Sequence, residues 1–265
     1  MEQPIALIGF GEAGATFAQA GEWRGRARGF DLLEARRTVM AGMGVTACDS
    51  AADAVSGASL VLSLVTADQA LTAAQEATRH IAPGALYCDM NSVAPETKRA
   101  AAQTIDAAGG RYVDVAVLAP VNPARLAVPL LISGPAAEDA QRALASAGFT
   151  NPRVVGKDVG KASAIKMIRS VMVKGIEALT DEMMQAAEAA GVADEVLASL
   201  DASEKASAWA QKAAYNRERM ATHGLRRAAE MEESAKTLSA LGIEPVMTRG
   251  TVQRQREAAK ERKEP

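Results

Sequence analysis

The sequence predicts an α/β fold in which a doubly wound parallel sheet is followed by an all-α C-terminal domain. Between Ile5 and Ala147, short apolar runs alternate with helix-compatible stretches, which is typical of a parallel sheet whose strands are joined by helices. A glycine-rich turn follows the first apolar run. No strand-like run follows Gly160. We therefore expect two domains, 1–158 and 159–265.

Short apolar runs in the first domain have the length and composition of buried strands. They are Ile5–Ile8, Arg28–Leu32, Leu60–Leu64, Ala85–Asp89, Tyr112–Val117 and Pro129–Ser133. The helices expected between them are Ala13–Ala20, Glu34–Gly42, Ser50–Val55, Gln69–Arg79, Pro95–Ala108 and Ala136–Ala147. Ser50 favours a helix start as an N-cap, and Pro95 does so as an early helical residue.

The second domain has the pattern of helices alone. Lys161–Ala190 is predicted as one long helix that Gly191 ends, because glycine favours the position after a helix. Two further helices are expected at Asp201–Thr222 and Leu225–Ala240, separated by His223 and Gly224. The last segment, Thr251–Lys263, is predicted as a polar helix or a frayed tail.

Composition excludes several classes of protein. The chain has 265 residues and a net charge of −2, which argues against an electrostatic nucleic-acid binder. No apolar run reaches the ~20 residues of a membrane span, and the N-terminal residues lack the basic region of a secretory signal. With two cysteines and two histidines, neither a disulfide framework nor a metal site is expected. We expect a cytosolic protein that contacts neither membrane nor nucleic acid.

The glycine-rich turn predicts a dinucleotide site in a Rossmann-type sheet. It reads Gly9-Phe10-Gly11-Glu12-Ala13-Gly14, between the first strand and the first helix. Gly9 permits the tight turn, Gly11 lets the backbone approach a pyrophosphate, and Gly14 allows close helix packing. The N–H groups at the start of the helix are then directed at the phosphates.

An acidic residue at the end of the second strand indicates the type of dinucleotide. Asp31 lies where a carboxylate usually accepts hydrogen bonds from the adenine ribose, and it would repel a 2′-phosphate. We therefore expect NAD as the cofactor. NADP stays open, because Arg36 and Arg37 are one turn further along the chain.

A lysine in the first long helix of the second domain is the candidate catalytic group. Lys166 shares a helix face with Ser170, and small residues precede it. A lysine whose pKa is lowered beside a nicotinamide can exchange a proton with a substrate hydroxyl while hydride moves. The alternative is an exposed helix lysine, which composition alone would favour.

Four motifs in order resemble the β-hydroxyacid dehydrogenase superfamily, which includes 3-hydroxyisobutyrate and 6-phosphogluconate dehydrogenases. They are the glycine-rich turn, the segment from Asp89 to Thr97, Asp114-Val115-Ala116-Val117, and the segment from Gly160 to Lys166. The stretch from Arg219 to Met231 looks like a branch of this superfamily with a C-terminal domain of unknown function.

The resemblance implies roles for particular residues. Lys166 matches the general acid/base lysine of the superfamily. The other matched positions are Val65 and Thr66 at the cofactor ribose, Asn91 and Ser92 at the nicotinamide end, and Leu118, Ala119 and Pro120 at the substrate carboxylate. This last segment departs from the usual Ser-Gly-Gly, because Leu118 has no hydroxyl and Pro120 has no N–H. Ser170 replaces the usual Asn, so the familiar short 3-hydroxy acids are doubtful substrates.

A second source of substrate contacts is a cluster expected at a helix start in the second domain. His223 and Arg227 share a face there, and we expect them to help line the substrate pocket, with a homodimer as one way for them to reach it. The alternative is a helix junction in which His223 caps the helix and the arginines pair with Glu230 in solvent.

Three functions remain open. The first is an NAD(P)-dependent oxidoreductase that acts on the CH–OH group of a 3-hydroxy acid-like small molecule, with Lys166 as general acid/base. The second is an imine reductase, which the apolar segment Leu118–Pro120 favours and Lys166 opposes. The third is a dinucleotide-binding protein without turnover.

Overall fold

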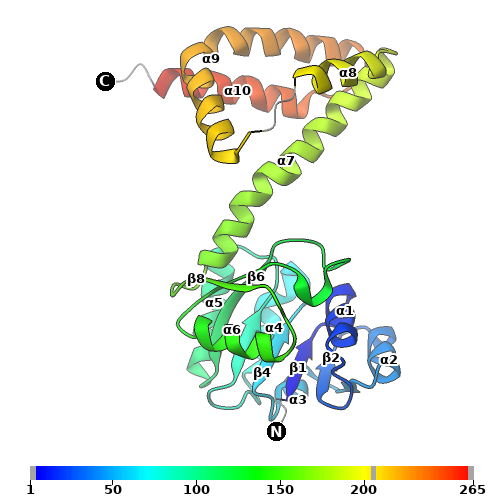
Figure 1. The fold of residues 1–265 in the computed structure, drawn as a ribbon, viewed down its shortest axis with the longest axis vertical. Coiled ribbons are helices and arrows are strands. Elements are labelled where there is room, and N and C mark those ends of the chain that lie inside the picture. The colour runs from blue at the N-terminus through cyan, green and yellow to red at the C-terminus, as the bar shows by residue number, and fades with distance from the viewer. Residues whose placement is uncertain (1–3, 204–206, 262–265) are drawn as a thin grey trace. The chain divides into compact units, whose positions relative to one another are not determined.

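The computed structural model of the chain describes residues 4–203 and 207–261. The chain forms two compact units, Met1–Arg169 and Ser170–Pro265 (Figure 1). This division falls inside a long helix, whereas the domain boundary expected from the sequence lies just before that helix begins. Each unit is described by itself below.

The first unit is built on an eight-stranded sheet with the order β3-β2-β1-β4-β5-β6-β7-β8 (Figure 1). The strands are β1 (Ile5–Ile8), β2 (Ala27–Phe30), β3 (Thr46–Ala47), β4 (Leu60–Ser63), β5 (Leu86–Asp89), β6 (Arg111–Val117), β7 (Leu130–Ser133) and β8 (Pro152–Gly156). The chain runs outward from β1 in both directions, so a crevice opens at the carboxyl ends of β1 and β4. The doubly wound architecture expected from the sequence is confirmed.

One pair of strands departs from the expected parallel sheet. β6 and β7 are antiparallel, with Asp114 opposite Ser133 and Val117 opposite Leu130. A parallel pair needs a crossover of a dozen or more residues that usually contains a helix. The connection here contains only the short helix η2 (Arg125–Ala127), so the chain returns antiparallel.

Each strand expected from the sequence is present within two residues of its predicted bounds, but two strands were missed. β3 has two exposed residues, too few for a periodic pattern. β8 is half-buried at the edge of the sheet and contains Arg153, so it lacks the apolar run of an inner strand.

Helices cover both faces of the sheet. α1 (Glu12–Ala20), α2 (Glu34–Gly42) and α6 (Ala137–Ser146) share one apolar core with the sheet, and α3 (Ala51–Val55), α4 (Ala70–Ala77) and α5 (Pro95–Ala107) share the other. The helix η1 (Ala67–Gln69) precedes α4. Alanines dominate both helical layers, which lets these helices approach the sheet closely.

The second unit is helical throughout its described residues. α7 (Lys161–Ala189) enters it from the first unit, and α8 (Ala193–Ser203), α9 (Trp209–Ala240) and α10 (Val246–Glu261) follow. Gly191 follows α7 with φ +69°, as its predicted place after a helix requires. The prediction for Asp201–Thr222 was wrong, because its first residues belong to α8 and residues 204–206 lie outside the described chain.

The expected break at His223 and Gly224 was also wrong, because α9 is continuous there. A Cβ on Gly224 would lie 2.2 Å from the backbone oxygen of Gln255 and 3.0 Å from the Cβ of Ala259. The glycine therefore lets α10 lie close against α9 instead of ending a helix. α10 begins five residues before the predicted Thr251, and residues 262–263 of that prediction are not described.

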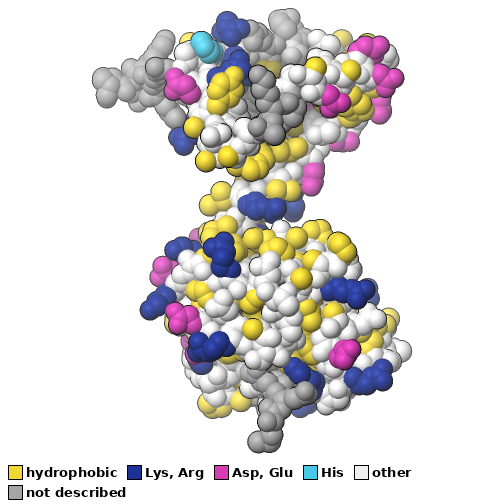
Figure 2. Space-filling model, in the orientation of Figure 1, with side chains coloured by type: hydrophobic (Ala, Val, Ile, Leu, Met, Phe, Trp, Pro, Cys, Tyr) yellow, Lys and Arg dark blue, Asp and Glu magenta, His cyan; other side chains and the backbone are white. Residues whose placement is uncertain are grey.

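On the face drawn in Figure 2, the described residues form no large patch of like-charged side chains. Basic and acidic side chains are scattered over the first unit in Figure 2, in keeping with the small net charge. Across residues 4–203 and 207–261, no helix is both long enough and apolar enough to cross a membrane.

Candidate active site

The glycine-rich turn has the geometry that an approaching phosphate requires. Gly9 has φ +91°, and a Cβ there would lie 2.5 Å from the backbone oxygen of Leu64. A Cβ on Gly14 would lie 2.7 Å from the oxygen of Gly9, whereas one on Gly11 would meet no heavy atom within 4 Å. α1 begins at Glu12 without a side-chain cap from Gly11. The turn thus leaves open space beside a helix N-terminus, which favours an anion.

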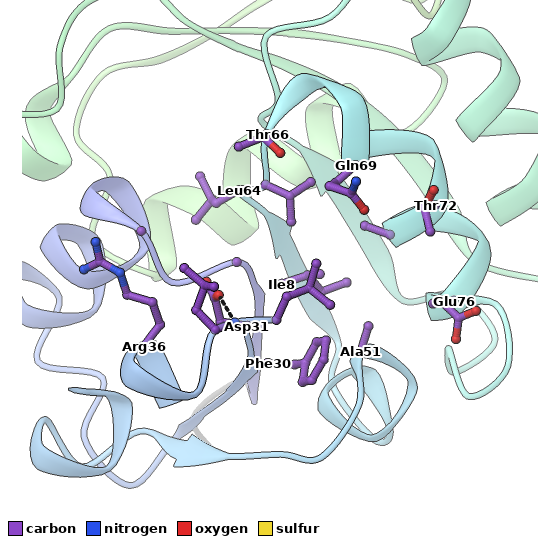
Figure 3. Close-up of a pocket in the computed structure, with 16 residues that line it drawn as sticks. Ile8, Phe30, Asp31, Arg36, Ala51, Leu64, Thr66, Gln69, Thr72 and Glu76 are labelled. Atoms are coloured by element: carbon purple, nitrogen blue, oxygen red, sulfur yellow. Dashed lines mark hydrogen bonds between the residues drawn. The ribbon is translucent and has the colours of Figure 1, made fainter. Parts of the chain in front are cut away.

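A cavity of about 410 Å³ adjoins this turn at the carboxyl ends of β1, β2 and β4 (Figure 3). Gly9, Gly11, Asp31, Val65 and Thr66 line it, as the sequence predicts for a dinucleotide site. The remaining walls are largely apolar and suit the faces of an adenine ring. The residues present therefore fit a dinucleotide whose phosphates approach Gly11.

Asp31 links the end of β2 to the glycine-rich turn. Its Oδ2 accepts a hydrogen bond from Phe10 N at 2.7 Å, and its Oδ1 accepts one from Leu33 N at 2.9 Å. Phe10 contributes its backbone to the site, because its side chain is fully buried in the core. Arg37 donates to the backbone oxygen of Asp31, and Arg36 lines the cavity (Figure 3).

Asn91 fixes the loop that follows β4. Its Oδ1 accepts from Val65 N at 2.7 Å, and its Nδ2 donates to Ser63 Oγ at 2.9 Å. The side chain is buried, and it holds both Val65, which lines the cavity, and Ser63 at the end of β4. A direct contact between Asn91 and a cofactor stays a prediction.

Lys166, near the start of α7, forms a hydrogen bond with Ser92, which follows the end of β5. Ser92 follows β5, and its Oγ accepts a hydrogen bond from Lys166 Nζ at 2.5 Å. Lys166 lies in the second turn of α7 and is half-buried. Ser170 follows one turn later in the same helix, as the first residue of the second unit.

The segment Leu118–Pro120 follows β6, next to β5 in the sheet. Leu118 is half-buried, and Ala119 and Pro120 are exposed. Further along the same loop, Asn122 Nδ2 donates to Glu12 Oε1 at 3.1 Å. This hydrogen bond joins the loop to the glycine-rich turn.

A buried ionic cluster beneath these groups was not foreseen from the sequence. Lys98 of α5 lies 2.9 Å from Asp89 Oδ1 and 3.5 Å from Asp114 Oδ1, and all three side chains are at most 1% exposed. Tyr112 donates to Asp89 Oδ2 at 2.7 Å. Burial, reinforced by the charge of Asp89, raises the pKa of Tyr112, so the phenol stays a hydrogen-bond donor.

Asp114 connects this cluster to the first turn of α7. Its Oδ2 accepts from Gly160 N at 3.1 Å and from Ser163 N at 3.0 Å. Ser133 Oγ accepts from Ala162 N at 2.9 Å. The carboxylate of a central strand therefore caps the helix that carries Lys166. The signal in the sequence was an acidic residue in each of two apolar strands, Asp89 at the end of β5 and Asp114 within β6.

The second-unit cluster does not lie where the sequence indicated. His223 and Arg227 are inside the continuous helix α9, not at a helix start, because Gly224 serves helix packing. His223 is exposed and Arg227 is half-buried. Their contribution to a substrate pocket stays a prediction.

Together, the glycine turn, the cavity at the reversal of strand order and the acid after β2 define a Rossmann-type dinucleotide-binding protein. The chain belongs to the family described as the NAD binding domain of 6-phosphogluconate dehydrogenase, which matches residues 4–156. Residues 187–258 match a domain of unknown function, DUF1932. The resemblance drawn from the sequence, including its C-terminal branch, is confirmed.

Solved structures agree with this assignment. A conserved hypothetical protein from Sinorhizobium meliloti is 36% identical, with a TM-score of 0.64 over 100% of this chain and 91% of that one. A conserved protein described as structurally similar to 3-hydroxyacid dehydrogenases is 31% identical, with a TM-score of 0.63 over 98% of both chains. An imine reductase from Myxococcus stipitatus, in complex with NADP+, shares the fold at 20% identity and a TM-score of 0.79 over 97% of this chain and 94% of that one.

Proposed function

We propose that this protein is an NAD-dependent dehydrogenase that oxidises the hydroxyl group of a small 3-hydroxy acid-like molecule, with Lys166 as general acid/base. The observation that carries the proposal is the hydrogen bond between Lys166 Nζ and Ser92 Oγ. This pair lies at the carboxyl edge of the same sheet that bears the dinucleotide cavity. Fold likeness to 3-hydroxyacid dehydrogenases supports the reaction class.

The chain's own residues would handle the proton of the reaction. When bound, the nicotinamide supplies the acceptor for the hydride that leaves the carbinol carbon. Neutral Lys166 Nζ accepts the hydroxyl proton as the C–O bond gains double-bond character, and the resulting ammonium returns it in the reverse direction. Ser92 Oγ holds the Nζ in place and donates its own hydrogen to the substrate oxygen.

NAD is the proposed cofactor because Asp31 lies in the cavity with its carboxylate anchored by two backbone N–H groups. A carboxylate fixed there accepts hydrogen bonds from the ribose hydroxyls and repels a 2′-phosphate. Arg36, which also lines the cavity, supports NADP as the alternative. The imine reductase from Myxococcus stipitatus is known in complex with NADP+, and a variant of it in complex with NAD+, so the fold alone favours neither cofactor.

Imine reduction is the second candidate. The apolar segment Leu118–Pro120 favours it, because an imine substrate needs no carboxylate site. Lys166 opposes it, since an ammonium group beside a protonated imine is repulsive. Binding of a dinucleotide without turnover is the third candidate, and the assay below separates all three.

We also propose that the chain is a homodimer, because α7 bears several exposed apolar side chains (Figure 2). They are Ile165, Ile168, Val171, Met172, Val173, Ile176 and Leu179. Light scattering of the purified chain checks this, and a monomeric mass would contradict it. Cytosolic residence and the absence of a nucleic-acid ligand stay predictions of the sequence.

The test is an activity panel with NAD and NADP, in which 3-hydroxy acids are oxidised and cyclic imines are reduced. We expect oxidation of at least one hydroxy acid, faster with NAD. Lys166→Met should lower kcat by about 100-fold or more, because general acid–base catalysis contributes 10²–10⁴-fold. Dinucleotide binding should be unchanged.

The matched control is Lys161→Met, which removes an exposed lysine of the same helix away from Ser92. Its kcat should equal that of the unaltered chain. Reduction of imines alone would establish the second candidate. Dinucleotide binding without any turnover would establish the third.

A further inference from the structure

The segment Leu118–Pro120 provides few hydrogen-bond donors for an anionic substrate. Leu118 N already donates to the oxygen of Pro129 at 3.0 Å, and Pro120 has no N–H. A different donor lies against this segment, because Arg169 Nη1 donates to the backbone oxygen of Leu118 at 3.2 Å. Arg169 was not among the residues singled out from the sequence.

Arg169 and Lys166 are directed at the ends of neighbouring strands. They lie three residues apart in α7 and therefore share a helix face. Lys166 reaches Ser92 after β5, and Arg169 reaches Leu118 after β6. β5 and β6 are parallel neighbours, whose backbones lie about 4.8 Å apart. All of these groups belong to the first unit.

We propose that Arg169 binds the carboxylate of the substrate and thereby makes anionic hydroxy acids the preferred class. A guanidinium carries five N–H donors in a planar fork that matches a carboxylate, so one bond to Leu118 does not exhaust it. The bond to Leu118 holds this fork at the end of β6, next to the strand whose end bears Ser92. With the carboxylate on Arg169, the hydroxyl of a 3-hydroxy acid lies towards Lys166.

Arg169 also discriminates against the competing substrate class. An iminium ion would face the positive charge of Arg169 and, during reduction, that of protonated Lys166, whereas a carboxylate is attracted by Arg169 in either direction of the reaction. This inference rests on the proposed dehydrogenase function for the identity of the reacting hydroxyl. The binding of the carboxylate itself does not depend on turnover.

A binding experiment tests the assignment without turnover. Malonate and glutarate, which carry no oxidisable hydroxyl, are titrated calorimetrically into the full chain saturated with NADH. We expect Kd for the better of the two to rise at least tenfold in Arg169→Gln and to be partly restored in Arg169→Lys, because a charged hydrogen-bond pair is lost and then regained. Arg142→Gln, which removes an exposed arginine of α6, should leave Kd unchanged.

A kinetic experiment separates this inference from the proposed function. Arg169→Gln should raise KM for a 3-hydroxy acid about tenfold or more but leave KM for its methyl ester unchanged, since the ester has no charge for Arg169 to bind. Equal KM values for the acid in both chains, or no binding of either dicarboxylate to the unaltered chain, would overturn the assignment. Dicarboxylate binding that depends on Arg169 without oxidation of any alcohol would refute only the proposed dehydrogenase.

Discussion

The two units of this protein are stabilised by different kinds of buried contact. In the first unit, a lysine and two aspartates meet in the middle of the sheet domain with essentially no exposure to solvent. In the second unit, α9 and α10 approach through Gly224, and Glu182 of α7 caps the start of α10. The fully buried ion pairs thus lie in the unit where the candidate active site is assembled. Steric fit and helix capping dominate in the helical unit.

The difference shows what each unit has to position. The buried cluster links β5, β6 and α5 and extends through Asp114 to the first turn of α7. It therefore holds the two strand ends that bear Ser92 and Leu118 in register with Lys166. An apolar core would stabilise the sheet equally well, but it would offer no acceptors for the N–H groups of α7.

The largest effect is expected when the buried cation is removed. Lys98→Met leaves Asp89 and Asp114 buried without a counter-charge, so the free energy of unfolding of the first unit should fall by about 3–5 kcal/mol. Urea unfolding followed by circular dichroism measures this.

The matched control for this change is Lys157→Met, since Lys157 is an exposed residue of the same unit. Its effect should stay within about 0.5 kcal/mol. A loss below about 1 kcal/mol in Lys98→Met would mean that the cluster contributes little beyond the apolar core.

A medium effect is expected when the close approach of α9 and α10 is blocked. Gly224→Ala places a methyl group 2.2 Å from the backbone oxygen of Gln255, which should destabilise the second unit by about 1–3 kcal/mol. Gly175→Ala in α7 meets no atom within 4 Å, so helix propensity alone should stabilise the chain by up to about 1 kcal/mol. Thermal unfolding of both variants measures whether each change raises or lowers stability. A Gly224→Ala variant that is more stable than the unaltered chain would contradict the packing described.

The smallest effect is expected at the cap of α10. Glu182 accepts hydrogen bonds from Met247 N, Thr248 N and Thr248 Oγ1. Burial raises the pKa of Glu182, but these hydrogen bonds outweigh burial and lower the pKa below its ordinary value of 4.5. The stabilisation from the carboxylate is therefore complete above pH 4.5 and is lost as the pH falls through the lowered pKa.

Glu182→Gln should consequently cost about 1 kcal/mol at pH 7, as loss of a helix cap usually does. The difference from the unaltered chain should disappear at low pH, where the native glutamate is itself protonated. Thermal unfolding from pH 3 to pH 7 measures this. A difference that stays constant over this range would show that the charge of Glu182 is not involved.

Much of the fold could be predicted because its signals are local. The glycine turn, the apolar strands and the long helix α7 each depend on residues close together in the chain. The predictions that failed concern residues whose role depends on contacts with distant parts of the chain. Gly224 has the composition of a helix break, and only its contact with Gln255, distant in sequence, explains why a glycine lies inside a helix.

The candidate site likewise contains residues that a local pattern predicts and residues that only distant contacts reveal. The cavity residues Gly9, Gly11 and Asp31 follow from a known spacing. Lys98 and Arg169 have the pattern of ordinary surface residues on helices. Their partners Asp89 and Leu118 lie on other elements, so no periodic signal marks the contacts.

Because Asp114 fixes the start of α7, the number of residues between this cap and Lys166 determines which side of the helix the lysine faces. Gly160 and Ser163 are tied to Asp114, and each further residue turns the helix by about 100°. Inserting or deleting one residue between Ser163 and Lys166 would swing the amine to another side of the helix without altering a single strand. The interval of three residues is therefore as important to the proposed proton transfer as the lysine itself.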